Sequence, residues 1–284
     1  KLSFARQYAE GIKQAGEITP EMREETHGEW VRYQKGTDPT ALWVSLQNKG
    51  AAWCTKGLAT AETQLKDGDF YVYYTYDRHG KPTIPRIAIR MQDEQIGEVR
   101  GVADNDQNLE GNMARIAEEK MKDLPGAERY RKASADMKTL TAIERKTKAG
   151  EILAKDNLRF LYELDSKIEG FGYKRDPRIR EILSGRDARE DLSWVLGVPR
   201  DKISTTREEA LRGGAVFHYG SLDLSRLTSA EGLKLPETIG GYLDLRGLTS
   251  AEGLKLPETI GGNLYLGGLT SAEGLKLPET IGGN

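Results

Sequence analysis

The sequence predicts an α+β protein with a small antiparallel three-stranded sheet packed by helices, followed by a C-terminal leucine-rich β-solenoid. Two observations predict this fold class. Three runs rich in β-branched and aromatic residues lie between residues 69 and 102, separated by short polar turns. From residue 227 onward, LTSAEGLKLPETIGG occurs three times at a spacing of 21 residues, which is typical of a solenoid. We expect an α+β head over residues 1–165, a helical linker over 166–213 and solenoid repeats over 214–284.

Helices are expected before the sheet. Apolar residues over 2–15 recur at helical spacing. Thr19 followed by Pro20 is typical of a helix start and predicts a helix that runs to about Gln34. Asp38 followed by Pro39 repeats this device and predicts a helix that ends near residue 49.

The first of the three expected strands has the strongest signal. Residues 69–76, DFYVYYTY, alternate so that Phe70 and Val72 share one face while Tyr71 and Tyr73 share the other. Because both faces are apolar, both are expected to be covered. The strands over 84–91 and 95–102 follow after short connections, which predicts an antiparallel meander.

Helical patterns return after the sheet. An apolar stripe over 109–121 predicts one helix, and further helices are expected over 127–148 and 151–162. Asp176-Pro177 is typical of another helix start, and residues 186–196 predict one more short helix.

Each repeat is expected to contain two extended triplets, which in the first copy are LKL at 233–235 and LDL at 243–245. Alternate leucines would point inward and the residue between them outward, and stacking at about 4.8 Å would pair the strands of neighbouring coils. This part resembles bacterial leucine-rich repeats of the short LPxx type. The resemblance implies that the exposed strand face binds protein, while copies this similar also suit a spacer.

Composition limits the function classes. The net charge is −2, and residues from Gly214 onward carry eight acids and five bases, so neither part has the strongly basic character typical of nucleic-acid binding. The single cysteine excludes an internal disulfide and fits a reducing, cytoplasmic setting. The absence of any run of eighteen apolar residues predicts no membrane span. The chain starts without Met and stops inside a repeat, so a fragment of a longer protein is expected.

Cys54, between Trp53 and Thr55, is a candidate nucleophile. A thiolate requires a base within hydrogen-bond reach, and none of the three histidines stands in a recognisable motif with it. The alternative is that Cys54 is a small buried apolar residue. One cysteine and scattered histidines give no metal-ligand spacing, so neither a metal nor another cofactor is expected.

Charged residues of the sheet form a second set of candidates. Alternation places Arg86 and Arg90 on one face of the second strand, and Glu98 and Arg100 on one face of the third. Together they would bind an anionic ligand, or would form a cross-strand salt bridge on a solvated face. Asn108 is a candidate N-cap at a helix N-terminus that could bind an anion.

The tyrosines of the first strand could stack on nucleic-acid bases, and packing within the sheet is the alternative.

The run from Trp53 to Asn108 resembles the PcfJ-like domain of bacterial mobile elements. The matching positions are Cys54, Gly68, Pro85, Arg100, Gly101 and Asn108. The chain departs from the family at Trp53, where the family has histidine, which puts cysteine–histidine chemistry in doubt. The resemblance implies an association with conjugative plasmids and phages and implies no activity.

These observations favour a non-enzymatic interaction protein, with a head that recognises a ligand or partner and a solenoid tail that binds protein or acts as a spacer. The alternative is a small or degraded enzyme that acts on a nucleotide or nucleic acid through Cys54, Glu98, Arg100 and Asn108. Nucleic-acid binding by the tyrosine-rich sheet and the arginine-rich helices is a third hypothesis.

Overall fold

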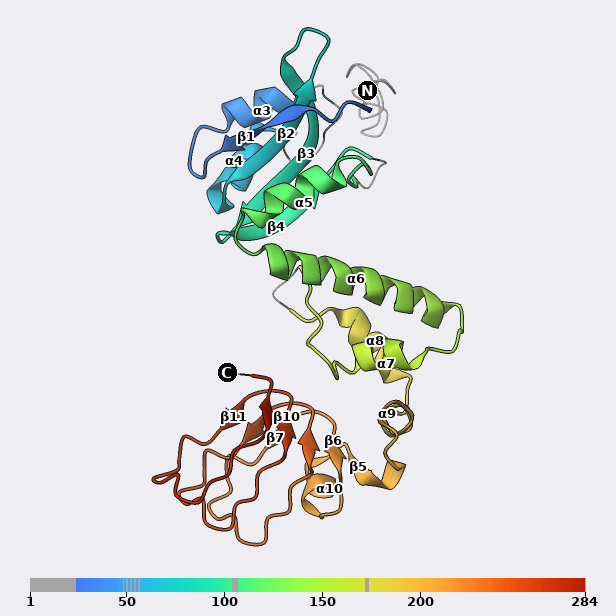
Figure 1. Ribbon diagram of the computed structural model, residues 1–284, viewed down its shortest axis with the longest axis vertical. Coiled ribbons are helices and arrows are strands. Elements are labelled where there is room, and N and C mark those ends of the chain that lie inside the picture. The colour runs from blue at the N-terminus through green and yellow to red at the C-terminus, as the bar shows by residue number, and fades with distance from the viewer. Residues whose placement is uncertain are drawn as a thin grey trace. The chain divides into compact units, whose positions relative to one another are not determined.

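The computed structural model describes residues 24–47, 49, 51, 53, 55, 57–103, 107–171 and 174–283 (Figure 1). The chain divides into two compact units, residues 1–134 and 135–284. The boundaries expected at residues 165 and 213 both fall inside the second unit. The helix expected over 2–15, the start of the one expected from Thr19, and Cys54 lie outside the described residues.

The first unit contains a four-stranded antiparallel sheet in the order β1-β2-β3-β4. Its strands are β1 (Gly28–Tyr33), β2 (Phe70–Tyr76), β3 (Pro82–Gln92) and β4 (Gln95–Arg100). The meander from β2 to β4 confirms the expected antiparallel sheet, but the sheet has four strands and not three.

The prediction of a helix reaching Gln34 is wrong, because Gly28–Tyr33 forms β1. This segment carries Trp30, Val31 and Tyr33, which suit a strand, and it pairs along its whole length with β2. Gly28 permits the close approach, since a Cβ atom there would lie 2.2 Å from the carbonyl oxygen of Tyr74. A distant strand therefore decides the conformation of this segment.

Helices cover both faces of this sheet, as its alternating apolar pattern predicts (Figure 1). On one face, α3 (Thr40–Leu46) and α4 (Leu58–Asp67) pack against Phe70 and Val72 of β2. On the other, α5 (Ala114–Lys122) packs against Ile87 and Ile89 of β3. The sheet is therefore a central layer with a core on each side.

Helices form the first part of the second unit. They are the portion of α6 (Ala127–Lys148) from residue 135 onward, α7 (Lys155–Leu161), α8 (Pro177–Ser184), α9 (Ala188–Leu196) and α10 (Arg207–Leu211), with a 3₁₀ turn, η1 (Arg200–Lys202). Their starts follow capping rules, since the side chains of Asp176 and Asp187 accept backbone hydrogen bonds at the first turns of α8 and α9. The helix expected from residue 151 begins only at Lys155, because residues 151–154 are not helical and Ala154 has an extended backbone.

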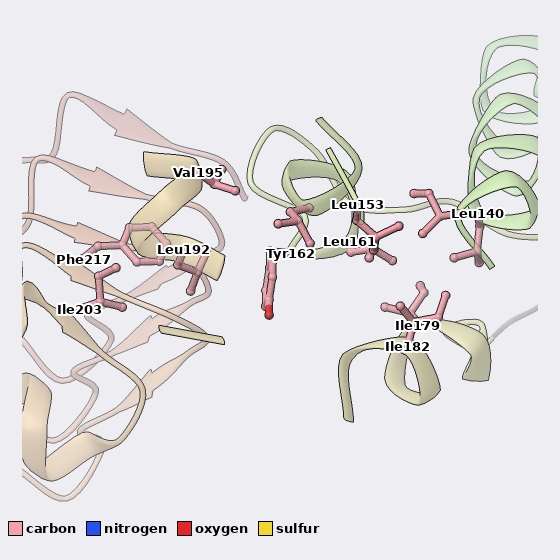
Figure 2. Close-up of a cluster of buried hydrophobic side chains, with 12 residues drawn as sticks. Leu140, Leu153, Leu161, Tyr162, Ile179, Ile182, Leu192, Val195, Ile203 and Phe217 are labelled. Carbon is pink, nitrogen blue, oxygen red and sulfur yellow. The ribbon is translucent and has the colours of Figure 1, made fainter. Parts of the chain in front are cut away.

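Leucine and isoleucine side chains from these helices share one core, which Figure 2 shows. Helices α6, α7 and α8 contribute Leu140, Leu161 and Ile182 to this core. Ile203 and Phe217, which belong to short strands of the solenoid, complete the same cluster. The helices and the first rungs of the solenoid are therefore held by one apolar core.

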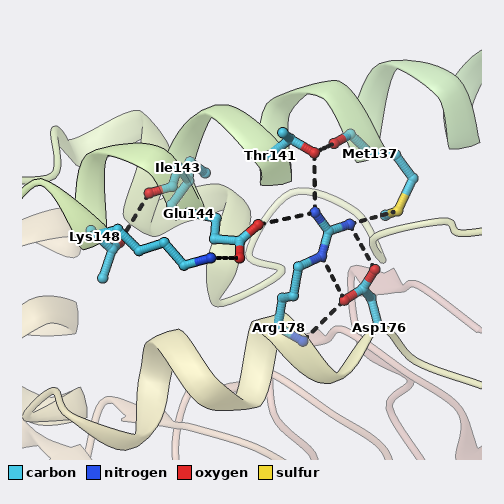
Figure 3. A network of polar contacts seen from close by, with 8 residues as sticks. Met137, Thr141, Ile143, Glu144, Lys148, Asp176 and Arg178 are labelled. Atoms are coloured by element: carbon cyan, nitrogen blue, oxygen red, sulfur yellow. Dashed lines mark hydrogen bonds and ion pairs between the residues drawn. The ribbon is translucent and has the colours of Figure 1, made fainter. Parts of the chain in front are cut away.

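A polar network fastens α8 to α6 (Figure 3). The guanidinium of Arg178 donates to Asp176 at 2.8 and 3.0 Å, to the hydroxyl of Thr141 at 3.0 Å and to Glu144 at 3.3 Å. Its hydrogen bonds with Asp176 are the main reason that the pKa of Arg178 is raised and that of Asp176 is lowered. Every charged partner is satisfied within the unit, so we assign this network a structural role.

The solenoid consists of short parallel strands in two sheets. One sheet has the order β5-β6-β8-β10-β12 and the other the order β7-β9-β11. The strands are β5 (Ile203–Ser204), β6 (Phe217–His218), β7 (Leu222–Asp223), β8 (Thr238–Ile239), β9 (Leu243–Asp244), β10 (Thr259–Ile260), β11 (Leu264–Tyr265) and β12 (Thr280–Ile281). The solenoid and its spacing of about 21 residues are confirmed over about three turns.

One detail of the predicted coil is wrong. Residues 233–235 are not a strand, and the second paired segment of the coil is Thr238–Ile239. Gly232 has a φ of +69° and the backbone N–H of Leu233 donates to Ala230, so the chain is turning there. Leu233 and Leu235 still pack against the solenoid core. Leucine alternation identified a buried segment but not its backbone hydrogen bonding.

Candidate functional site

Trp53 and Thr55, the neighbours of Cys54, are both buried in the first unit. Trp53 packs in the core beneath α3 and α4, and its Nε1 donates a 2.8 Å hydrogen bond to the carbonyl oxygen of Gly101. This bond connects the Trp53 segment to the residue that directly follows β4. The roles predicted for Trp53 and Thr55 in ligand binding stay predictions.

Gly101 also lies against the segment around Asn108. A Cβ atom at Gly101 would lie 2.2 Å from the carbonyl oxygen of Asn108, so only glycine fits there. Ala103 and Asn108 exchange two backbone hydrogen bonds of 3.0 Å. The structure therefore brings together Trp53, Gly101 and Asn108, three positions that are separated in the sequence.

The predicted N-cap role of Asn108 is wrong. Helix α5 begins at Ala114, and Met113 is its N-cap residue. Asn108 cannot open the helix, because its backbone pairs with Ala103 in an antiparallel bridge. Its predicted role in anion binding at a helix N-terminus therefore has no geometric basis.

Glu98 and Arg100 form a charged network with Arg90 at the edge of the sheet. Arg100 Nη2 lies 2.7 Å from Glu98 Oε1, and Arg90 Nε lies 3.7 Å from Glu98 Oε2. Arg90 and Glu98 are direct cross-strand partners, as are Ala88 and Arg100. Ala88 belongs to the core beneath α3 and α4, so the network lies on the same face of the sheet as that core and Trp53. Its partial exposure limits each ion pair to about 1 kcal/mol of stabilisation.

Arg86 is not part of that network. The register pairs Tyr73 with Ile87 and Tyr74 with Pro85, so Arg86 is the extra residue of a β-bulge. Its Nη1 lies 3.4 Å from the hydroxyl of Thr75, which alternates onto the face opposite Phe70, Val72 and Tyr74. Arg86 therefore lies on the face opposite Arg90 and Glu98, and the prediction that Arg86 and Arg90 share a face is wrong.

The Arg86 side chain is fully buried and its charge is balanced inside the protein. Its Nε donates to Glu110 Oε2 at 2.7 Å, and its Nη1 donates to the carbonyl oxygen of Glu25 at 2.6 Å. Glu110 itself is only 10% exposed. This pair holds the segments before β1 and before α5 against the sheet, which is a structural role for a residue predicted to bind a ligand.

A different set of residues stands out in the solenoid. Units starting at Ser221, Tyr242 and Asn263 are identical except at their first, third, fifth and sixth positions. Stacking explains the difference at the sixth position. A Cβ atom at Gly247 would lie 2.4 Å from the carbonyl oxygen of Ser225 in the preceding coil, so glycine is needed there. Of the other three positions, the third lies within β7, β9 and β11, and the first and fifth lie on either side of these strands.

These three positions form what we call the outer grid. The grid comprises Ser221, Asp223, Ser225, Tyr242, Asp244, Arg246, Asn263, Tyr265 and Gly267. Leu222, Leu243 and Leu245 alternate with grid residues and point into the core. The register places Asp223 beside Asp244 and Asp244 beside Tyr265. The leucine pattern does not predict this surface, but a comparison of the three copies position by position reveals it.

Side chains of the outer grid contact one another. Arg246 donates to Asp244 through Nε at 3.0 Å and Nη2 at 2.6 Å, and these hydrogen bonds lower the pKa of Asp244. The Arg246 guanidinium also lies 5.4 Å from the ring centre of Tyr265. The rings of Tyr242 and Tyr265 meet edge to face with centres 6.0 Å apart, and both residues remain more than a third exposed. Tyr242, Tyr265 and Arg246 are therefore exposed to solvent, whereas Asp244, which pairs with Arg246, is only 3% exposed.

Comparison of the chain with protein-family models, curated proteins and solved structures found no match. The resemblance to PcfJ-like domains therefore stays a prediction. Within the described part of the chain, no cluster of three His, Cys, Asp or Glu side chains is arranged to hold a metal ion. No helix of that part combines the length and apolar character needed to cross a membrane.

Proposed function

We propose that the chain is a binding protein whose solenoid recognises a protein partner through the outer grid. The observation that carries this proposal is that the differences between the coils, apart from the sixth position that stacking explains, are confined to the outer grid. The first unit would act as a second recognition module, with the partly exposed Glu98–Arg100 network as its candidate contact.

Exposure alone does not account for this pattern. Lys234, Lys255 and Lys276 are exposed at equivalent positions and are identical, as are Glu231, Glu252 and Glu273. Packing does not require these charged side chains, so a passive spacer would have diverged there as readily as on the grid. The differences instead gather where they change what a partner would contact.

The residue types on the outer grid support the same conclusion. Its positions alternate among Ser, Asp, Tyr, Asn, Arg and Gly. Tyrosine and arginine are enriched at the energetically dominant positions of protein interfaces, and serine, glycine and asparagine are common in antibody combining sites. Tyr242 and Arg246 are therefore the expected anchors of the interface.

Affinity capture with the full chain tests this proposal. A variant with Tyr242→Ser and Tyr265→Asn replaces both rings with polar residues that occur elsewhere on the grid. We expect it to lose partners that the wild-type chain retains from a bacterial lysate, as measured by quantitative mass spectrometry. We also expect its melting temperature to change by only a few degrees, because the two rings are partly exposed.

The matched control replaces the exposed lysines of the invariant surface, Lys234→Ser, Lys255→Ser and Lys276→Ser. This control should retain the same partners as the wild-type chain. Equal capture by the grid variant and by the wild type would show that the grid is not the recognition surface.

A further inference from the structure

The outer grid contains its own example of the chemistry that it accepts. In the middle coil, Arg246 lies between a carboxylate and an aromatic ring. Its guanidinium donates hydrogen bonds to Asp244 and lies over the ring of Tyr265. Paired hydrogen bonds to a carboxylate and stacking on an aromatic face are the two interactions for which arginine is best suited. Both partners of this guanidinium come from the grid.

One coil earlier, the carboxylate remains but the arginine does not. Asp223 occupies the position of Asp244, whereas Ser225 occupies the position of Arg246. Among the described residues, no cationic group lies within ion-pair distance of the exposed Asp223 carboxylate. Hydrogen bonds from Ser225 are the main reason that the pKa of Asp223 is lowered, and the charged groups that act on this pKa are Asp244 and Arg246 of the next coil.

An aromatic ring is also present near Asp223. Asp223 faces Asp244 in register, and Tyr242 lies two residues before Asp244, so Tyr242 is a diagonal neighbour of Asp223 across the two strands. The Tyr242 side chain is 39% exposed. Asp223 and Tyr242 therefore offer a carboxylate and a ring to a group from outside the chain.

The charge and the dimensions of the outer grid restrict the kind of partner that it can bind. Two aspartates and one arginine give the grid a net charge of −1, and residues from Gly214 onward carry eight acids and five bases. Such a surface attracts a basic segment over about a Debye length of 8 Å. Three columns across three coils span only about 13 by 10 Å, whereas a folded partner typically covers about 800 Å². A short segment fits this surface better than a globular face.

We propose that the outer grid binds an arginine-bearing extended segment of a protein partner, with the guanidinium on Asp223 and against Tyr242. This inference rests on the proposed function and specifies the chemistry of the partner. Asp223 and Tyr242 would supply the same two kinds of group that Asp244 and Tyr265 supply to Arg246, but in a different arrangement, because Tyr242 is at the first position of its coil and Tyr265 at the third.

Selection of a random peptide library displayed on phage against the full chain tests this inference. We expect the enriched peptides to contain arginine. Synthetic versions should bind about tenfold more weakly to Asp223→Asn, which removes the charge but retains an oxygen that can accept from the backbone of Ser225. Replacing the peptide arginine with citrulline should weaken binding by a similar factor. Glu252→Gln, an exposed carboxylate outside the grid, should leave affinity unchanged.

A second variant works in the opposite direction. Ser225→Arg gives the first coil the arginine that the second coil already has, so the new side chain should occupy Asp223 and block the peptide without unfolding the coil. Peptides that depend on the grid but lack arginine would overturn this inference while supporting the proposed function. Peptides whose affinity is the same for wild type, Asp223→Asn and Ser225→Arg would also overturn it.

Discussion

The sheet of the first unit and the solenoid of the second use β-structure in opposite ways. In the first unit, four antiparallel strands bury both faces under helices, and Arg86 is balanced by Glu110 inside the protein. In the solenoid, paired segments of only two residues repeat in parallel, and no helix of the described residues covers the side that bears the exposed residues Asp223 and Tyr265. In the first unit, where each side chain packs in its own environment, buried polar residues such as Arg86 stabilise the fold. Where packing repeats, the outward positions are available for recognition.

Removing the buried charge of the first unit should produce the largest effect. Arg86→Met leaves Glu110 in a mostly buried site without its cation, which typically costs about 3–5 kcal/mol. We expect hydrogen exchange of the β3 amides to accelerate about a hundredfold or more. Adding Glu110→Gln to this variant should restore part of the loss. Arg100→Ala, at an ion pair that is partly exposed, should cost less than about 1 kcal/mol. Equal effects at Arg86 and Arg100 would contradict the structural role of Arg86.

Truncating one leucine of the solenoid should have the next largest effect, and it should depend on position. Leu243 is fully buried and its strand pairs on both sides, so Leu243→Ala should cost about 2–5 kcal/mol. Leu264 is only partly buried, and its strand pairs with β9 alone among the described strands. Leu264→Ala should therefore cost clearly less. Urea denaturation of both variants measures the difference, and equal losses would contradict coil-by-coil stacking.

A smaller effect is expected at β6, where a histidine takes the place that isoleucine has in later coils. His218 pairs in register with Ile239, is 2% exposed, and shares a 3.0 Å hydrogen bond between its Nδ1 and Ser204 Oγ. Burial lowers the pKa of His218, while Glu209 and backbone contacts with Ser221 and Ser204 partly oppose that effect.

The sign of the pH dependence follows from this lowered pKa. As the pH falls, His218 in the unfolded state binds a proton near its ordinary pKa of about 6.5, whereas the folded state binds one only at a lower pH. The stability that comes from neutral His218 is therefore fully present above about pH 6.5. This stability should be lost as the pH falls from about 6.5 through the folded-state pKa. His218→Ile should remove this loss, as measured by melting temperature between pH 5 and pH 8. A variant with the same acid sensitivity as the wild type would exclude His218 as its source.

Sequence patterns identified the elements whose partners are local. The β2–β4 meander and the long helix α6 follow from alternation and from helical periodicity over contiguous residues. β1 was missed, because its conformation depends on pairing with β2, whose first residue comes more than thirty positions later. In the solenoid, leucine spacing predicted burial correctly, but a glycine turn and not alternation decides that residues 233–235 are unpaired.

The candidate site was harder to predict, since it depended on register. Strict alternation placed Arg86 beside Arg90, and the single inserted residue of the bulge moved it to the opposite face. Glu98 and Arg100 met as expected because no irregularity separates them. The outer grid required no register at all, only a comparison of the three copies with one another.

Shared strand pairing between the helical part and the coils has a consequence for how such arrays change. Because β5 and β6 supply the first rungs of one sheet, every later coil meets an interface of the same kind. Recombination between nearly identical gene segments can therefore insert or delete whole 21-residue blocks without any change in β5 and β6. Reach and surface chemistry can vary in this way while the foundation of the array is kept.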